Sequence, residues 1–386
     1  MYTPSELERM PVEIERIMSK LSERVMEDIV RRIRINDEIT RSADWQIYRL
    51  VQTGKSTEEI QRYIKEALDL TNAEINRLYD EVIKAGYARD EEIYEKVGVN
   101  FIPFKENAEL QQLVQAVISQ TKEELENITR TLGFAIDYNG KTIFTPMSEY
   151  LHQVLDKAVM EVTTGAFDYN TTLKRVVNEM VRSGVRSVDY ETGHSNRIEV
   201  AARRALMTGV NQVVSKINDK NAEALGTEFF EVSWHATARP THQIWQGRVY
   251  TRQELVDICG LGTVTGLLGA NCYHSYYPFI PGISKRQWTD EELDRMNAAE
   301  NKPKEYKGKE YTTYEATQRQ RELETLMRAQ RRKIKLLKAG SGEGELLDEA
   351  RAAYRTTMAQ YVNFSKQMGL PQQRERIYMD GLGRVG

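Results

Sequence analysis

The sequence is poor in cysteine, in proline and in long apolar runs, and each shortage excludes a class of protein. Its 386 residues include two cysteines, Cys259 and Cys272, which are too few for a disulfide framework. The 9 prolines are unevenly placed, which leaves long stretches free to form helices. No apolar stretch is long enough to span a bilayer, and the polar, acidic N-terminus lacks the layout of a signal peptide. We therefore expect a chain that folds in a reducing compartment and has no membrane contact.

The sequence also lacks an excess of charge of either sign. The formal net charge is −3, from 54 basic and 57 acidic residues. A protein whose whole surface binds nucleic acid is usually more basic, so any nucleic-acid contact should be local. The combination of 40% hydrophobic and 29% charged residues is typical of a folded protein with solvated helix faces.

Helical periodicity dominates what is present. Apolar residues form a helical stripe from Ile14 to Ile33. Ser56-Thr57 and Thr71-Asn72, each followed by acidic residues, resemble the N-caps of further helices. The sequence therefore predicts a mainly α protein with long helices, at about 5–35, 38–52, 57–69, 72–86, 107–132, 147–164, 168–182, 194–222, 319–338 and 345–368.

Two segments depart from the helical pattern. Asn139-Gly140 lies between two short apolar runs and predicts a β-hairpin near 134–144. Residues 226–283 are dense in aromatics and glycines and lose the helical period, so we expect a small α+β module of short strands and ordered loops there.

These patterns divide the chain into four consecutive regions. They are a helical bundle at 1–100, a helical region with the hairpin at 101–225, the α+β module at 226–283, and a charged helical region at 284–386. Phe101 and Phe104 interrupt the helical pattern between the first two regions. We expect these aromatic rings to need a partner surface that covers them.

The residues best suited to metal chemistry lie in the α+β module. His235, His242, Cys272 and His274 offer imidazole and thiolate groups, the ligands that zinc favours. Their spacing matches no common zinc-finger pattern. Two interpretations stay open: a zinc site, or a hydrogen-bonded clasp with Arg239 in a loop-rich core. Both require the two sequence blocks to converge in space, which we predict. No other cofactor is expected.

Two further groups of polar residues also have competing interpretations. The segment around His194 would supply a catalytic base and phosphate-binding arginines, or an ion-pair network between a helix and a loop. A basic run at 328–338 would neutralise several phosphates of a nucleic acid, or form a solvated helix face. The basic run comprises Arg328, Arg331, Arg332, Lys333, Lys335 and Lys338.

The patterns of conventional enzymes are missing from the sequence. The glycine-rich segment 260–266 lacks the spacing of a phosphate-binding loop. Neither a hydrolase triad, nor a nucleophile elbow, nor a pair of catalytic carboxylates can be recognised. We therefore do not expect an enzyme.

Five blocks of sequence carry a resemblance to a known family. They are WHATARPTHQIWQG at 234–247, NCYHSYYPFIPG at 271–282, GHSNR at 193–197, AARRA at 201–205 and TGVNQ at 208–212. In order and spacing they resemble the phage minor capsid protein 2 family over most of the chain. A weaker similarity extends to the head-morphogenesis proteins of Mu-like phages, which carry an Arg-x-x-His element followed by a His/Cys element.

The resemblance implies a minor structural protein of the phage head that assembles in the host cytoplasm. Its partners would be the portal protein and the major capsid protein, with a role in head assembly and in genome packaging or ejection. We expect the N-terminal bundle or the long helices to contact the portal. The resemblance implies no catalytic residue, and a structural role is expected for His194, Asn196, Arg197, Arg203, Arg239 and Asn271.

The competing hypothesis is a DNA-binding protein, or a metal-dependent nuclease or toxin-like enzyme, carried in the virion. In that case the basic helix at 328–338 would contact DNA.

Overall fold

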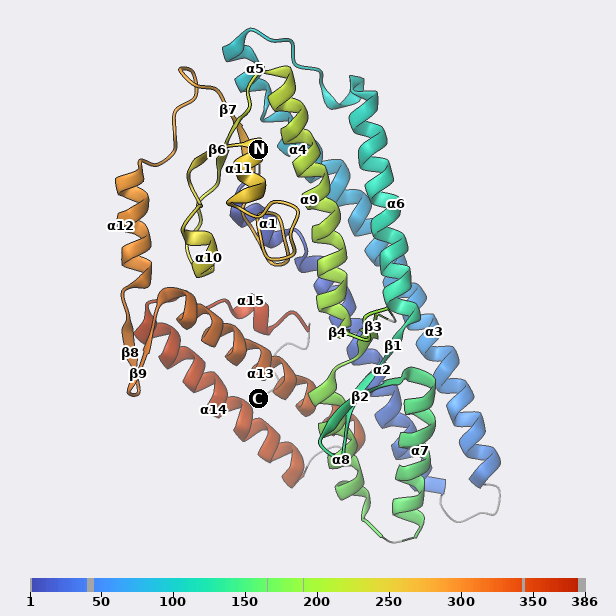
Figure 1. Cartoon of the computed structure of the whole chain (residues 1–386). Coiled ribbons are helices and arrows are strands. Elements are labelled where there is room, and N and C mark those ends of the chain that lie inside the picture. Colours follow the sequence, from blue (N-terminus) through green and yellow to red (C-terminus); the bar gives the residue numbers. More distant parts are fainter. Residues whose placement is uncertain (1, 40–44, 165, 190, 342–343, 381–386) are drawn as a thin grey trace. The chain divides into compact units, whose positions relative to one another are not determined.

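Helices form the first part of the described chain, and short antiparallel strands lie between the helices from Leu132 onward (Figure 1). The computed structural model describes residues 2–39, 45–164, 166–189, 191–341 and 344–380. Helices make up 66% of the structure. This composition confirms the mainly α fold with a small α+β module that the sequence predicts.

The helices follow one another as α1 (Pro4–Arg9), α2 (Val12–Ile39), α3 (Trp45–Arg77), the π-helix η1 (Leu78–Ile83), α4 (Lys84–Ala88), α5 (Glu91–Val97), the 3₁₀ turn η2 (Phe104–Glu106), α6 (Ala108–Arg130), α7 (Met147–Thr163), α8 (Tyr169–Ser183), α9 (Ile198–Ala224), α10 (Pro240–Gln243), α11 (Arg252–Asp257), α12 (Asp290–Asn301), α13 (Thr313–Ser341), α14 (Glu345–Met368) and α15 (Arg374–Ile377). Among the described residues, none of these helices is long and apolar enough to cross a membrane.

The strands form three antiparallel sheets. Their bounds are β1 (Leu132–Tyr138), β2 (Lys141–Pro146), β3 (Arg186–Val188), β4 (Ser195–Arg197), β5 (Phe229–Val232), β6 (Val249–Thr251), β7 (Tyr276–Phe279), β8 (Lys304–Tyr306) and β9 (Lys309–Tyr311). The strand orders are β2-β1-β3-β4, β6-β5-β7 and β8-β9.

The chain forms two compact units, each built from three separate stretches. Unit 1 contains Met1–Glu13, Asn72–Glu124 and Arg203–Gln318, and unit 2 contains Ile14–Thr71, Leu125–Ala202 and Arg319–Gly386. Helices α3, α6, α9 and α13 each continue from one unit into the other. The four consecutive regions inferred from the sequence stay a prediction.

Helix α3 is continuous at two positions where the sequence predicts that one helix ends and another begins. The helix runs through Ser56 and Thr71, which we expected to be N-caps. The Ser56 hydroxyl donates to Asp28 in α2, and Thr71 Oγ1 donates to the carbonyl of Ala67 at 2.6 Å, so neither hydroxyl ends the helix. The boundaries predicted at these two positions are therefore wrong. Residues 40–44 of the predicted helix 38–52 lie outside the described residues.

The hairpin predicted near 134–144 is confirmed in unit 2. Strands β1 and β2 pair from Gly133 opposite Pro146 to Tyr138 opposite Lys141. Asn139 and Gly140 have φ values of 51° and 79°, as a tight hairpin turn requires. Strands β3 and β4 extend this sheet and were not predicted, because three residues are too few to show alternation.

A three-stranded sheet forms the centre of the α+β module in unit 1. Strand β5 pairs with β6 on one side and with β7 on the other. Helix α9 lies beside this sheet (Figure 1) and is tied to it by hydrogen bonds to Tyr276. Ser215 Oγ lies 2.8 Å from the Tyr276 hydroxyl, and Asn218 Nδ2 donates to the Tyr276 carbonyl at 2.5 Å. The buried core of the module consists of Ala222, Phe230, Val232, Trp245, Tyr250, Leu255, Cys259, Leu261, Leu267, Cys272 and Tyr276.

Gly209 allows α9 to approach its neighbours closely within unit 1. A Cβ at this position would lie 2.5 Å from the Tyr79 hydroxyl and 2.6 Å from Thr121 Oγ1. Residue 209 belongs to the TGVNQ block, so packing gives one physical reason for a small residue in that block.

Phe101 and Phe104 are both half-buried within unit 1. The Phe101 ring lies 4.9 Å from the Tyr87 ring and 5.2 Å from the Tyr94 ring. Lys84 Nζ lies 5.3 Å from the centre of the Phe104 ring. Their own unit therefore covers these aromatics in part, and the expectation of an external partner stays a prediction.

Candidate metal centre

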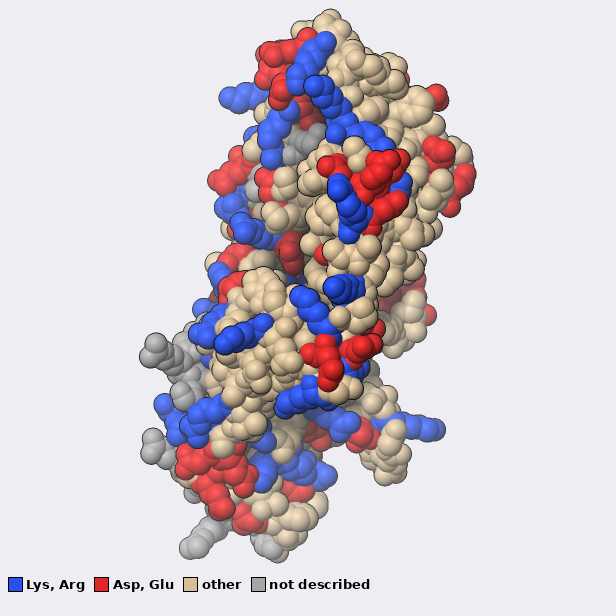
Figure 2. Space-filling model, turned by 90° about the vertical axis from the view of Figure 1, so that its left-hand side faces the viewer, with Lys and Arg blue, Asp and Glu red and all other residues tan. Residues whose placement is uncertain are grey.

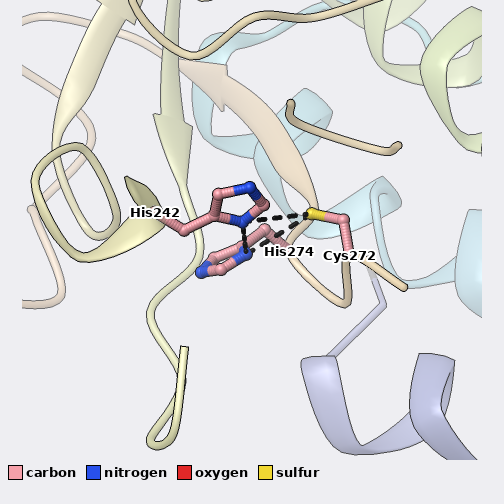
Figure 3. Close-up of side chains that lie close together, drawn as sticks. All are labelled: His242, Cys272 and His274. Carbon is pink, nitrogen blue, oxygen red and sulfur yellow. Dashed lines mark hydrogen bonds between the residues drawn. The ribbon is translucent and has the colours of Figure 1, made fainter. Parts of the chain in front are cut away.

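Three of the four candidate ligands meet in the interior of the α+β module (Figure 3). His242 Nδ1 lies 3.4 Å from His274 Nδ1. Cys272 Sγ lies 3.8 Å from His242 Nδ1 and 3.4 Å from His274 Nδ1. The exposed fractions of these residues are 2%, 3% and 1% for His242, Cys272 and His274. The two sequence blocks that we expected to converge are thus brought together.

Local backbone structure positions these side chains. His242 lies in the short helix α10, which begins at Pro240, a residue suited to the first turn of a helix. The Ser233 amide donates to the Ser275 carbonyl at 2.8 Å, which continues the pairing of β5 with β7. Cys272 and His274 therefore lie beside the chain that leaves β5.

Arg239 and Asn271 shape the loop that precedes the second block. Arg239 Nη2 donates to the Ala270 carbonyl at 2.7 Å, which ties the end of the glycine-rich loop to the start of α10. Asn271 has a φ of 56°, a conformation that asparagine tolerates better than most residues. Both residues thus take part in the backbone structure of this loop, and the structural role expected of them stays a prediction.

The far nitrogen of each buried imidazole faces a fixed acceptor. His242 Nε2 lies 2.8 Å from the Thr265 carbonyl, and His274 Nε2 lies 2.9 Å from Gln246 Oε1. The Trp245 ring packs 4.4 Å from the His242 ring and 4.8 Å from the His274 ring. The sequence did not identify Thr265 and Gln246 as part of this site. Thr265 acts through its backbone carbonyl, and a glutamine in a sequence does not by itself indicate a contact with a histidine.

His235 lies next to the three-residue group. Its ring packs 4.1 Å from the His274 ring, and its Nδ1 lies 2.9 Å from the Ala236 carbonyl. The group whose ligand atoms lie within 4.8 Å of one another consists of His242, Cys272 and His274. The structure therefore places the fourth candidate beside the cluster rather than among its ligand atoms.

Burial controls the protonation of the three groups. It lowers the pKa of His242 to about 4 and holds the pKa of His274 well below its ordinary value. It also raises the pKa of the Cys272 thiol. Without a bound cation the site therefore holds two neutral imidazoles and a thiol, and the thiol must lose its proton to become a strong metal ligand.

The family known as phage minor capsid protein 2 matches residues 2–364. The chain belongs to this family. It is also similar to a structural protein of Lactococcus phage LL-H, with 22% identity over 256 residues that cover 62% of this chain and 67% of the relative. No solved structure gives a significant match. This minor capsid protein therefore has a structural role in the phage virion.

Three family blocks of the minor capsid protein line one cleft in unit 1. The cleft has a volume of about 600 Å³ and lies between α9 and residues 261–273. The Arg203 guanidinium donates to the Tyr273 hydroxyl, and Asn211 Nδ2 donates to the Leu268 carbonyl at 2.7 Å. The block at 201–205 therefore bonds to the block at 271–282, and the block at 208–212 bonds to the loop that precedes it.

The GHSNR block belongs to unit 2 of the minor capsid protein. His194 is exposed, and its carbonyl accepts from the Asp189 amide at 3.0 Å in the turn between β3 and β4. Asn196 pairs with Ser187 across these strands, and Arg197 Nη2 donates to the Arg182 carbonyl at 3.2 Å. The block forms a hairpin, which favours the structural interpretation over a catalytic one.

The basic run of α13 turns its arginines into the interior of unit 2. Arg331 is fully buried, and its Nε and Nη2 donate to the two carboxylate oxygens of Asp380 at 2.6 and 2.8 Å. Arg332 is 3% exposed, with its Nε 4.0 Å from Glu23 Oε1.

The remaining residues of the run are also held by the protein. Lys335 Nζ lies 2.9 Å from Glu27 Oε1, and Arg328 Nη2 donates to Thr325 Oγ1 at 3.1 Å. Lys333 is half-buried. All six residues of the basic run lie in the described part of the chain, and Lys338 is the only one of them that is exposed. Arg331 and Arg332 therefore do not belong to a solvated helix face, and the charges of the run do not form a continuous surface for phosphates.

Proposed function

We propose that this minor capsid protein binds the portal protein and the major capsid protein in the phage head, and that it joins them during head assembly in the host cytoplasm. The observation that carries this proposal is the family match over residues 2–364, which spans nearly all of both compact units. The long helices and the α+β module thus both belong to a protein of the capsid.

Exposed apolar side chains are frequent in the α+β module and support a contact surface there. Ile244 is 71% exposed and Val264 is 75% exposed. Five of the fifteen exposed large apolar residues among the described residues lie in 226–283, with Val256, Ile258 and Ile283 as the other three. Exposed apolar side chains are typical of surfaces that bind another protein. We assign the portal to this surface.

The charge distribution favours a protein partner over nucleic acid. On the face shown in Figure 2, basic and acidic side chains are interspersed and broad uncharged areas lie between them. A protein that binds DNA through its backbone needs a basic patch or stripe. The basic run of α13 does not supply one, because Arg331 and Arg332 are buried among carboxylates.

The alternative of a metal-dependent nuclease or toxin-like enzyme has less support. A catalytic metal site keeps one position open to substrate. His242, Cys272 and His274 are at most 3% exposed, and the ligand group contains no carboxylate that would act as a base. A structural role for the cluster fits this burial better.

Co-expression with the portal and the major capsid protein of the same phage tests the proposal. The double variant Ile244→Ser, Val264→Ser should lose at least roughly tenfold in portal binding, since burial of each apolar side chain contributes about 1.5–3 kcal/mol. Leu326→Ser, at a 47% exposed position of α13, is the matched control and should bind as the unaltered chain does. Capture of neither partner by the unaltered chain would contradict the proposal.

A further inference from the structure

We propose that His242, Cys272 and His274 bind one Zn²⁺ ion through the two Nδ1 atoms and the Cys272 sulfur, and that this ion holds the α+β module together. The three atoms already stand at the separations that such an ion imposes. Zinc bound at about 2.0–2.1 Å to nitrogen and about 2.3 Å to sulfur has tetrahedral edges of about 3.3 Å between nitrogens and about 3.6 Å from nitrogen to sulfur. The observed separations are 3.4 Å between the nitrogens and 3.4 and 3.8 Å to the sulfur.

The hydrogen-bond network fixes the tautomer of His242. Its Nε2 faces the Thr265 carbonyl, which can only accept, so the proton must lie on Nε2. The Nδ1 atom of this neutral imidazole therefore carries a lone pair that points at the cluster (Figure 3).

The tautomer of His274 follows from the orientation of Gln246. Gln246 Oε1 accepts from the His235 backbone amide at 3.2 Å, and Gln246 Nε2 donates to Asn297 Oδ1. Asn297 is fixed in turn, because its Nδ2 donates to the Gln243 carbonyl. Gln246 thus presents its oxygen to His274 Nε2, which must carry the proton.

Two lone pairs and a sulfur atom consequently face one another in a buried site. The thiol proton can satisfy one nitrogen, and the other nitrogen would then face only acceptors. Leaving a buried acceptor without a donor is costly. A divalent cation satisfies all three atoms at once, and the thiol releases its proton to solvent as the zinc–sulfur bond forms.

The surroundings of the cluster resemble the outer shell of a zinc site. Ligating histidines almost always donate their second N–H to a carbonyl, carboxylate or water, as His242 does to Thr265 and His274 does to Gln246. A thiolate with two imidazoles suits zinc better than magnesium or calcium, which prefer oxygen ligands. The ion links α10, the glycine-rich loop and the entry to β7.

The chain offers a matched control for the sulfur ligand. Its two cysteines, Cys259 and Cys272, are both buried in the core of the module. The variant Cys259→Ala leaves Cys272 as the only sulfur of cysteine in the chain. A thiolate signal from a bound metal in that variant can therefore come from Cys272 alone, without a substitution at the site itself.

The experiment measures metal content and a cobalt spectrum on the full chain, with any affinity tag removed. Elemental analysis should find about one zinc per chain. After removal of zinc and addition of Co²⁺, we expect the visible bands of tetrahedral cobalt and a near-ultraviolet thiolate charge-transfer band. Both should persist in Cys259→Ala and in His235→Ala, and X-ray absorption of the zinc form should show one sulfur at about 2.3 Å.

Several results would overturn the assignment. Folded chain that contains no zinc and gives no thiolate–cobalt band refutes the site. A thiolate–cobalt band that disappears in Cys259→Ala shows that Cys259, and not Cys272, binds the metal. Loss of metal in His235→Ala refutes the set of three protein ligands.

Discussion

Removal of the Asp380 carboxylate should destabilise unit 2, because Arg331 would stay buried without its bidentate partner. Arg331 is 0% exposed and donates to both oxygens of Asp380, at 2.6 and 2.8 Å. Loss of one partner from a buried ion pair costs about 3–5 kcal/mol. The Tyr378 ring lies 4.7 Å from the guanidinium carbon and continues to stabilise the cation. We therefore expect Asp380→Ala to lower the free energy of unfolding by about 3 kcal/mol.

Circular dichroism during thermal and urea unfolding measures this change. For a unit of roughly 200 residues, 1 kcal/mol shifts the Tm by about 2–4 °C, so the expected fall is about 6–12 °C. Asp348→Ala is the matched control: Asp348 also pairs with an arginine, Arg351 at 3.4 Å, but its side chain is 74% exposed. This control should leave stability unchanged within error.

A double substitution separates the charge effect from the loss of packing. Arg331→Met combined with Asp380→Leu removes both charges and keeps apolar volume, so it should recover most of the lost stability. If Asp380→Ala unfolds at the same temperature as Asp348→Ala, the pair does not hold unit 2 together. The explanation of the basic run as structural would then be refuted.

Three further predictions address other parts of the molecule. Burial raises the pKa of Glu23 from 4.5 to about 7. Because the folded state holds this proton more tightly than the unfolded state, the free energy of unfolding should fall as the pH rises from about 4.5 through about 7. In thermal melts, Glu23→Gln should abolish this dependence on pH. Gly209→Ala should lower the free energy of unfolding in urea by about 1–3 kcal/mol, because α9 has no room for a methyl group at this position. Gly54→Ala, where a Cβ would meet nothing within 4 Å, should instead raise it by about 0.5–1 kcal/mol. Equal effects of the two substitutions would contradict the packing argument. Gln246→Leu removes the acceptor of His274 Nε2 and should weaken zinc binding by about 10–100-fold in a chelator competition, and an unchanged affinity would contradict this role of the glutamine.

Much of the fold was predictable because apolar periodicity and turn chemistry are local signals. The stripe from Ile14 to Ile33 lies in α2, and Asn139-Gly140 forms the hairpin turn. The helix starts predicted at Ser56 and Thr71 are wrong, since a hydroxyl that donates to its own helix or to a neighbouring carboxylate looks the same in sequence as an N-cap. The assembly of each unit from three separate stretches leaves no local trace at all.

The candidate metal centre was predictable in its residue types and not in its surroundings. The two aromatic blocks carry imidazole and thiol groups, and these residue types can be read directly from the sequence. They predicted that the two blocks meet in space. The Thr265 carbonyl belongs to a backbone position and could not be identified in this way. The basic run of α13 was misjudged for a related reason: its acidic partners, such as Glu23, lie in helices about 300 residues away in the chain.

Cross-linking mass spectrometry of purified phage heads tests the proposed place of this minor capsid protein most directly. We predict that its peptides are present in heads at a small fraction of the abundance of the major capsid protein. We also predict cross-links from Lys285, an exposed lysine beside the α+β module, to the portal. Heads that lack this chain, or that cross-link it at Lys285 to other proteins and never to the portal, would contradict the proposed function.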